Sequence, residues 1–285
     1  MKPSKNVYKR SRPLLGTFVE ISLWGAPTKT LEKCGEKTFD AIEKISSLMS
    51  FHDPKSELSR MNRLAVGKWM KISQHTKNVL KFALELQTLT HGQFNVAIAK
   101  PLMAWGFLPE NSKYKEKSKF NHWHHLDHPG FELKGLNVRI ILPVKIDLGG
   151  IAKGYAVDFA TEILKKHVSK RVSRSICGCI NSGGDLRVFG NEELCIGIRS
   201  GKSTLHLTQL KNQSLATSSI ILKTKQSPYI DIQKRKSLAS LMTAVVRADH
   251  CMTADALTKV ALLSPPAQAE KVALKYRAEM SLIPQ

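Results

Sequence analysis

The chain lacks any long hydrophobic run. Although 42% of its 285 residues are hydrophobic, no stretch approaches the roughly 20 apolar residues that cross a membrane. The basic residues of Met1–Arg10 are not followed by the apolar segment that a secretory signal peptide requires. We therefore expect no membrane span and, for the sequence as given, a cytoplasmic location.

Acidic residues are also scarce. The 23 Asp and Glu stand against 44 Lys and Arg, which gives a formal net charge of +21. The basic residues form short groups, such as Lys113–Lys119 and Lys234–Lys236, without the interleaved aromatic residues of a surface that binds single-stranded nucleic acid. We expect no specific nucleic-acid partner. Attraction of anionic dinucleotides, acidic proteins or lipid headgroups stays open, as do non-specific RNA binding and a basic composition without functional meaning.

Cysteine is rare, and the odd number of five scattered residues argues against a disulfide framework. Two groups admit a metal-binding reading: the pair Cys177 and Cys179, and the histidines His122, His124, His125 and His128. Neither has the ligand spacing of a standard zinc site. We therefore favour small core side chains for the cysteines and a solvated loop for the histidines.

The hydrophobic pattern predicts an α+β chain with mixed β-sheets flanked by helices. The predicted helices are Thr30–Met49, His75–Leu89, Ala152–Lys166, Ala254–Leu263 and Ala267–Tyr276, and the predicted strands lie in Thr17–Leu23, Lys134–Ile146 and Ile176–Val246. Residues 1–11 are expected to form a basic N-terminal tail, and residues 12–285 a single domain. No internal repeat interrupts the domain.

The most informative segment is Ile146–Asp158, with the sequence IDLGGIAKGYAVD. It places an apolar strand, a glycine turn and the start of a helix in direct succession. Gly149 and Gly150 allow backbone amides to approach a ligand, and the positive end of the following helix favours an anion such as phosphate. Taken alone, the segment is also compatible with an ordinary strand-to-helix turn.

Further motifs accompany this segment in a fixed order along the chain. They are Arg12–Ile21, Ser56–Asn62, Gly92–Asn95 with Pro101, Leu102 and Trp105–Phe107, and then Asn181–Asp185, Ala216–Ser218 and Thr253–Leu257. Together they cover about residue 12 to about residue 263. In this order, the blocks resemble those of the FAD:protein FMN transferases, the ApbE-like family, which has the pattern D-L-G-G-I-A-K-G-Y-A-x-D.

The resemblance implies an ApbE-like fold and a defined reaction. FAD is cleaved at its pyrophosphate, and FMN is transferred to a Ser or Thr hydroxyl of an acceptor protein with release of AMP. Asp147 and Lys153 would contact FAD. The other positions that the resemblance assigns to the flavin pocket are Leu15, His52, Gln93, Phe94 and Asn95.

The resemblance also implies a Mg²⁺ ion, held by the backbone carbonyl of Gly150, the carboxylate of Asp255 and the side chain at position 259. Asp255 is thereby the candidate catalytic residue. Relatives have Thr at the last position, whereas this chain has Lys259, and an ammonium cannot ligate a cation. Thr258 lies one residue early, about 100° around the helix. Two outcomes stay open: Lys259 points away, or its ammonium takes the place of the cation beside Asp255.

Other departures concern the flavin pocket. Leu15 replaces a Met, His52 a Tyr, Asn95 an Asp and Ser219 a Gly, and Pro228 stands where relatives have a His, which leaves the general base unassigned. Asp231 keeps the family's Asp. Asp185 is interpreted mainly as a turn residue between strands, with contact to a ligand as the second possibility.

Because of these departures, the transferase reading has three alternatives. One is a paralog that binds FAD without transferring FMN, the second is an FAD pyrophosphatase that uses water as the acceptor, and the third is a basic nucleic-acid-binding protein.

Overall fold

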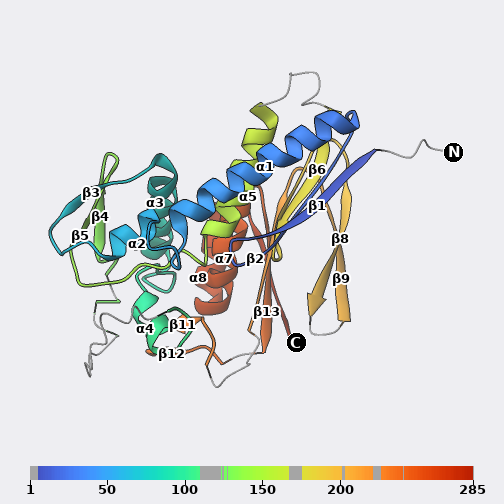
Figure 1. Cartoon of the computed structure of the whole chain (residues 1–285). Helices are drawn as coiled ribbons and strands as arrows, with labels where there is room; N and C mark the ends of the chain where they lie inside the picture. Colours follow the sequence, from blue (N-terminus) through green and yellow to red (C-terminus); the bar gives the residue numbers. More distant parts are fainter. Residues whose placement is uncertain are drawn as a thin grey trace.

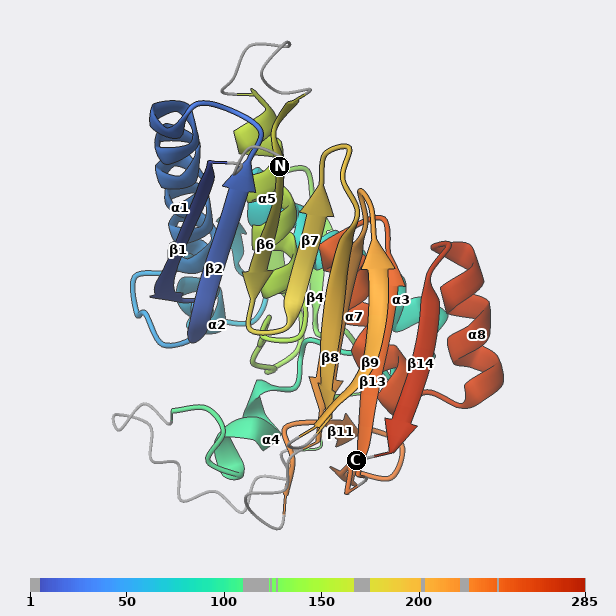
Figure 2. The ribbon, with the colours of Figure 1, turned by 90° about the vertical axis from the view of Figure 1, so that its right-hand side faces the viewer.

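A computed structural model describes residues 6–109, 123, 125–126, 128–166, 175–200, 203–220, 226–239 and 241–284. Its centre is a seven-stranded antiparallel sheet. The strand order is β1 (Val7–Leu14), β2 (Thr17–Trp24), β6 (Cys177–Ser182), β7 (Asp185–Phe189), β10 (Ser214–Ser219), β13 (Met242–Ala248) and β14 (Glu279–Pro284). The sheet therefore has the N-terminal strand at one edge and the C-terminal strand at the other (Figure 2).

The edge strand β1 corrects one prediction. Residues 7–11, which we assigned to a basic tail, form part of this strand and pair with β2 along its whole length. Tyr8 is buried, and the guanidinium of Arg12 lies 4.2 Å from the ring centre of Phe39. Lys9 and Arg10 of this segment are exposed on an edge strand, which sequence composition alone does not distinguish from a tail.

The helices α1 (Thr28–Met49), α5 (Ala152–Lys166), α7 (Cys251–Leu263) and α8 (Pro266–Lys275) cover one face of the sheet (Figure 2). They match the predicted helices, although α7 begins three residues earlier. The buried side of α1 includes Leu31, Phe39 and Ile45, as its amphipathic pattern indicates. Together with the inward side of the sheet, these helices form the main hydrophobic core.

The hairpin of β8 (Leu194–Ser200) and β9 (Ser203–Leu210) covers part of the opposite face of the sheet, over β7, β10 and β13. A second, smaller core lies beneath it, made of Leu186, Val188, Ile198, Leu210, Leu215 and Val245. Side chains alternate along β7, so Leu186 and Val188 face the hairpin while Asp185 and Arg187 face the helices. This alternation places two charged residues of one strand on the helix side.

A smaller lobe lies at one end of α1 (Figure 1). It contains α2 (Glu57–Asn62), α3 (Gln74–Leu89) and a three-stranded sheet of β3 (Trp69–Lys71), β5 (Asn137–Ile140) and β4 (Phe131–Lys134). Two short elements lie near the lower end of the large sheet in Figure 2. They are α4 (Ala99–Ala104) and the two-stranded ribbon of β11 (Ile230–Asp231) and β12 (Lys236–Ser237).

The strand predicted over Lys134–Ile146 is shorter than expected. Regular pairing ends at Ile140, and the segment 141–148 has no ladder partner and bends at Leu142 and Pro143. Pro143 lacks the backbone N–H that a ladder requires. Backbone groups beyond it bond outside a sheet instead, since Ile146 pairs with the side chain of Asn62 and the N–H of Asp147 donates to Val96.

Within the described part of the chain, no helix is long and apolar enough to cross a membrane. The same residues contain no group of three or more His, Cys, Asp and Glu side chains arranged to hold a metal ion. His122 and His124 of the predicted histidine loop lie outside the described residues. The described cysteines are all free.

Candidate functional site

The glycine turn is fixed by its neighbours before any ligand is considered. The Asn62 amide donates to the Ile146 carbonyl at 2.8 Å and accepts from the Ile146 N–H at 2.7 Å. The N–H of Asp147 donates to the Val96 carbonyl at 2.8 Å, and the Asp147 carboxylate accepts from the Gly149 N–H at 3.2 Å. The motif residue Asn62 thus holds the segment that presents Asp147, and the Gly92–Asn95 block is brought beside it.

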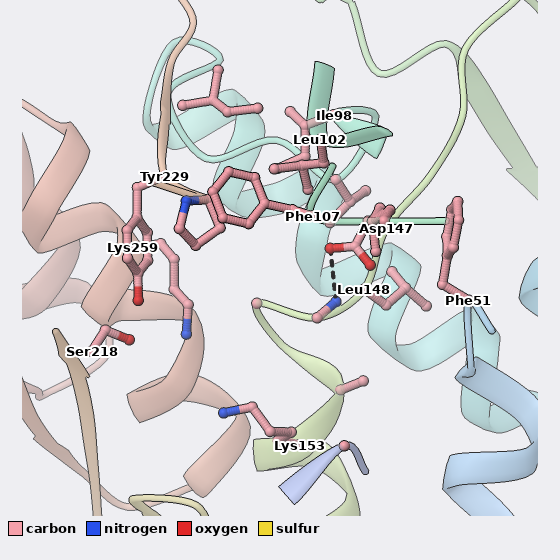
Figure 3. Close-up of a pocket in the computed structure, with 18 of the residues that line it drawn as sticks. Phe51, Ile98, Leu102, Phe107, Asp147, Leu148, Lys153, Ser218, Tyr229 and Lys259 are labelled. Carbon is pink, nitrogen blue, oxygen red and sulfur yellow. Dashed lines mark hydrogen bonds between the residues drawn. The ribbon is translucent and has the colours of Figure 1, made fainter. Parts of the chain in front are cut away.

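A cavity of about 580 Å³ opens at this turn (Figure 3). It is lined by every residue that the sequence assigned to FAD binding, namely Leu15, His52, Gln93, Phe94, Asn95, Asp147 and Lys153, together with Gly150 and Lys259. These residues come from five separate segments of the chain. Asp255 does not line the cavity, because it is fully buried beneath Lys259 on α7.

One side of the cavity, which we call the charged wall, consists of Lys153 and Lys259 with their buried partners Asp185 and Asp255. Lys153 of α5 forms an ion pair with Asp185 of β7, and Lys259 forms one with Asp255 four residues earlier in α7. The Lys259 ammonium also donates to the Asp255 carbonyl at 3.0 Å. Figure 3 shows both ammonium groups pointing toward the same part of the cavity.

Mutual charges set the pKa values of this wall. Burial raises the pKa of Asp255, but the ammonium groups of Lys259 and Lys153 lower it more, so the carboxylate is ionised. Burial and the charge of Asp255 raise the pKa of Asp185 to about 6. For Lys153, burial lowers the pKa, but Asp255 and Asp185 raise it more. Lys153 therefore stays cationic, and Asp185 is the member of the cluster that titrates near neutral pH.

Asp185 is the main correction to the site prediction. Its interpretation as a turn residue is wrong, because it is the first residue of β7, is fully buried and pairs with Lys153. One of its oxygens, Oδ1, has no hydrogen-bond partner among the described residues. The preceding pair Gly183-Gly184 is a turn signal in the sequence. The role of Asp185 depends instead on Lys153, which α5 places opposite β7.

The opposite side, which we call the apolar wall, carries Phe51, Ile98, Leu102, Phe107 and Leu148 from loops and a short helix, with the carboxyl group of Asp147 among them (Figure 3); Phe94 also lines the cavity. Among them lies Gln93, whose Oε1 is buried and has no partner among the described residues. Such an orphan acceptor in an apolar surrounding calls for an N–H donor from a ligand. The wall therefore suits a flat heteroaromatic ring with a polar edge.

Two of the predicted cavity residues have structural constraints of their own. Leu15 has a φ of +56° in the two-residue turn between β1 and β2, a conformation that non-glycine residues seldom adopt. Asn95 is buried, donates to the Leu126 carbonyl at 2.6 Å and accepts from the Ala97 N–H at 2.7 Å. An Asp at this position lacks the donor for Leu126, which explains the departure from the family's Asp.

Asp158 is a residue whose role the sequence analysis missed. Its carboxylate accepts from the N–H groups of Cys251 and Met252, both at 2.9 Å, and pairs with Arg187. It thereby caps the N-terminus of α7, the helix that presents Asp255 and Lys259. Asp158 is the last residue of the glycine motif and lies six residues after the start of α5. Only the long-range packing of α5 against α7 shows its role.

Gly154 allows this packing. A Cβ at this position would lie 2.3 Å from the Cys251 carbonyl oxygen and 2.8 Å from the Asp255 Cβ. The bare backbone lets the Gly154 N–H donate to Asp255 Oδ2 at 3.0 Å. The glycine of the K-G-Y triplet therefore fixes α5 against α7 and positions the Asp255 carboxylate.

The donor set at Asp255 does not fit a magnesium ion. One carboxylate oxygen is paired with the Lys259 ammonium and the other accepts from Gly154. Thr258 is fully buried, and its hydroxyl bonds the Asp255 carbonyl and Ser218, each at 2.7 Å, so it does not replace the family's Thr. Of the two outcomes left open for Lys259, the ammonium beside Asp255 is the one observed.

The segment that departs from the family's H-x-x-D-P pattern also reaches the cavity. Pro228 and Tyr229 line it, whereas Asp231 is buried and accepts from the Lys234 N–H at 2.9 Å. The described lining residues include one histidine, His52, which is exposed. Position 228 thus provides a rigid apolar contact in place of a side chain that exchanges protons.

The fold and the cavity define a class of protein: an α+β protein with a cationic wall for an anionic group facing an apolar wall for a ring. The ApbE family model matches residues 15–283. The chain therefore belongs to the ApbE family.

Curated relatives and solved structures agree with this assignment. An FAD:protein FMN transferase of Vibrio cholerae is 27% identical over 198 residues, which are 66% of this chain and 56% of the relative. Another, of Haemophilus influenzae, is 28% identical over 175 residues, which are 58% of this chain and 49% of the relative. The chain spans about half the length of these curated relatives.

Two crystal structures resemble the fold over almost the whole chain. The ApbE protein of Thermotoga maritima has a TM-score of 0.82 at 23% identity, covering 98% of this chain and 97% of its own. The apo flavinyl transferase ApbE of Pseudomonas stutzeri also has a TM-score of 0.82, at 18% identity, covering 100% of this chain and 93% of its own. The predicted ApbE-like α+β fold is confirmed.

Proposed function

We propose that the protein is an FAD:protein FMN transferase. A hydroxyl oxygen of an acceptor Ser or Thr attacks the phosphorus of the FMN half of FAD. The bond from that phosphorus to the bridging oxygen breaks, the electron pair leaves with AMP, and the hydroxyl proton passes to solvent. The products are a phosphoester of FMN on the acceptor protein and free AMP.

One observation supports this proposal above the others: two ammonium groups and an apolar wall with an orphan acceptor face the same cavity. FAD combines an anionic pyrophosphate with flat rings that have N–H donors. In the proposal, Lys153 and Lys259 bind the pyrophosphate, the apolar wall binds a ring, and Gln93 accepts from an N–H of that ring. Family membership and the names of the curated relatives point to the same substrate.

The residues orient the substrate rather than supply a nucleophile. Holding the pyrophosphate between two fixed ammonium groups neutralises the charge that gathers on the leaving AMP. The Mg²⁺ expected from the resemblance would act in the same way, but the donor set at Asp255 does not fit it, and no step is assigned to it. The cytoplasmic location and the lack of a specific nucleic-acid partner stay predictions.

The proposal is tested by incubating the purified protein with FAD and an acceptor protein of a flavin transferase relative. AMP release and covalent flavin fluorescence in a denaturing gel are followed together, with Lys153→Met as the inactive control. Fluorescence on the acceptor that appears with stoichiometric AMP, and is lost in Lys153→Met, supports the transferase. AMP without a labelled acceptor identifies a pyrophosphatase.

A second candidate, a paralog that binds FAD without transfer, is favoured by two observations at the reacting end of the cavity. Lys259 occupies the carboxylate of Asp255, and Pro228 replaces the family's His. Tightly bound FAD that yields neither AMP nor labelled acceptor selects this paralog.

A further inference from the structure

Lys259 lies across the space between Gly150 and Asp255. A Cβ built on Gly150 would be 3.4 Å from the Lys259 Cε and 3.8 Å from both its Cδ and its Cγ, so the lysine stem runs against the glycine. The ammonium at its end bonds the Asp255 carboxylate and carbonyl. The side chain of Lys259 is 14% exposed, and its exposed part faces the cavity. A positive charge is therefore built into the chain at the position between these two residues.

The ammonium keeps donor capacity for a ligand. A lysine ammonium has three N–H donors, and Lys259 directs two of them to Asp255. Lys153 directs one to Asp185. One donor of Lys259 and two of Lys153 thus remain for oxygens of an anionic group in the cavity where the two side chains converge.

The neighbouring hydroxyl does not compete for this position. Thr258 lies on the buried side of α7 and bonds Ser218 of β10. A divalent cation would have to displace the Lys259 ammonium from Asp255, at the cost of leaving a lysine that is largely buried without its counter-charge.

We propose that Lys259 is a built-in replacement for the divalent cation: its ammonium, together with Lys153, binds the FAD pyrophosphate, so that FAD binding needs no metal ion. This inference rests on the proposed function for the identity of the ligand. Where a threonine hydroxyl and a divalent ion would contribute two positive charges, the Lys259 ammonium contributes one. The site therefore has one positive charge fewer. It follows that any transfer is slower than in a metal-bearing site but insensitive to chelators.

The test is a titration of the full chain with FAD, followed by quenching of flavin fluorescence, in excess EDTA and in millimolar MgCl₂. The wild type is compared with Lys259→Thr, which restores the family's residue, and with Lys259→Met, which keeps the stem without the charge. Lys271→Thr, the same change at an exposed position of α8, is the matched control. Thermal melting confirms that each variant is folded.

The proposal predicts a wild-type affinity that changes less than about twofold between EDTA and Mg²⁺. Lys259→Thr should lose about tenfold in EDTA and recover with Mg²⁺, because a hydroxyl and a freed carboxylate are ligands that this ion accepts. Lys259→Met should be weak in both conditions, and Lys271→Thr should match the wild type. AMP release, measured in parallel samples that also contain the acceptor protein, should persist in EDTA for the wild type.

Two results would overturn the proposal. In one, EDTA weakens the wild type by about tenfold or more and Mg²⁺ restores it, while Lys259→Met binds like the wild type. In the other, the wild type binds no FAD in either buffer, which refutes the proposed function as well. A wild type that binds FAD but releases no AMP in the presence of the acceptor protein refutes the transferase alone, and the comparison of the binding curves still decides the role of Lys259.

Discussion

The charged wall and the apolar wall of the cavity differ in both chemistry and support. Lys153, Lys259 and their partner aspartates lie on α5, α7 and β7, whose backbones are fixed in the main core. The apolar wall lies on loops and on the short helix α4. The difference indicates that the pyrophosphate end of the ligand is bound by a preformed site, whereas the ring end is bound by segments that vary more easily.

The largest effect should come from the charged wall. Lys153→Met removes one cation and leaves Asp185 buried without its counter-charge. We expect FAD affinity to fall about 100-fold, since hydrogen bonds between charged groups contribute roughly 2–3 kcal/mol. Fluorescence titration measures this, and Lys165→Met, on the same helix but outside the cavity, is the control. A loss below about threefold would remove Lys153 from the binding site.

The apolar wall should show a smaller effect. Phe107→Ala removes an aromatic contact, so FAD affinity should fall about tenfold while AMP affinity changes little. Phe18→Ala is the matched control, because Phe18 is 71% exposed and lies outside the cavity. Equal losses for FAD and AMP would show that this wall does not bind the flavin ring.

A pH effect of a few-fold should come from Asp185. Its pKa of about 6 exceeds the value near 4 of an unfolded aspartate. Between these values the folded chain holds the extra proton, so this residue lowers the free energy of unfolding as pH rises through the window. Its ionisation above pH 6 also cancels one cation of the charged wall, so FAD affinity should fall slightly as pH rises.

Asp185→Asn cannot ionise and should flatten both profiles relative to the wild type. Chemical denaturation and FAD titration at a series of pH values measure the two effects. Identical pH profiles for the variant and the wild type would contradict the assignment of the raised pKa to Asp185.

The smallest effect on affinity should come from Asp158, which supports the charged wall without entering the cavity. Asp158→Asn weakens the cap of α7 and the ion pair with Arg187, and should lower the free energy of unfolding by about 2 kcal/mol. The folded fraction should bind FAD within about twofold of the wild type. A large loss of affinity with unchanged stability would mean that Asp158 itself contacts the ligand.

The features that were predicted from the sequence share one property: they depend on the residues around them in the chain. The glycine turn, the positions of the cavity residues and most of the helices were found in this way. Asp185 and Asp158 were misread or missed because their roles depend on partners 32 or more residues away in sequence, Lys153 in one case and α7 in the other. A single sequence does not show such pairings.

Secondary structure was mispredicted where local signals compete with tertiary contacts. The segment before Asp147 is apolar enough for a strand. However, Pro143 has no N–H to donate, and the Ile146 N–H donates to the side chain of Asn62 instead of to a neighbouring strand. Residues 7–11 have the charge of a tail, yet they pair with β2 as part of an edge strand. The position of the Lys259 ammonium was left open by the sequence, because both outcomes were compatible with the same helix face.

The most direct test of the two-wall account compares FAD with riboflavin, which has the flavin ring but no phosphate. Both are titrated against the wild type and Lys153→Met. The account predicts that the wild type binds FAD about 100-fold tighter than riboflavin, and that Lys153→Met loses most of this difference while its riboflavin affinity is unchanged. Equal affinity of the wild type for the two ligands would contradict the charged wall as the pyrophosphate site.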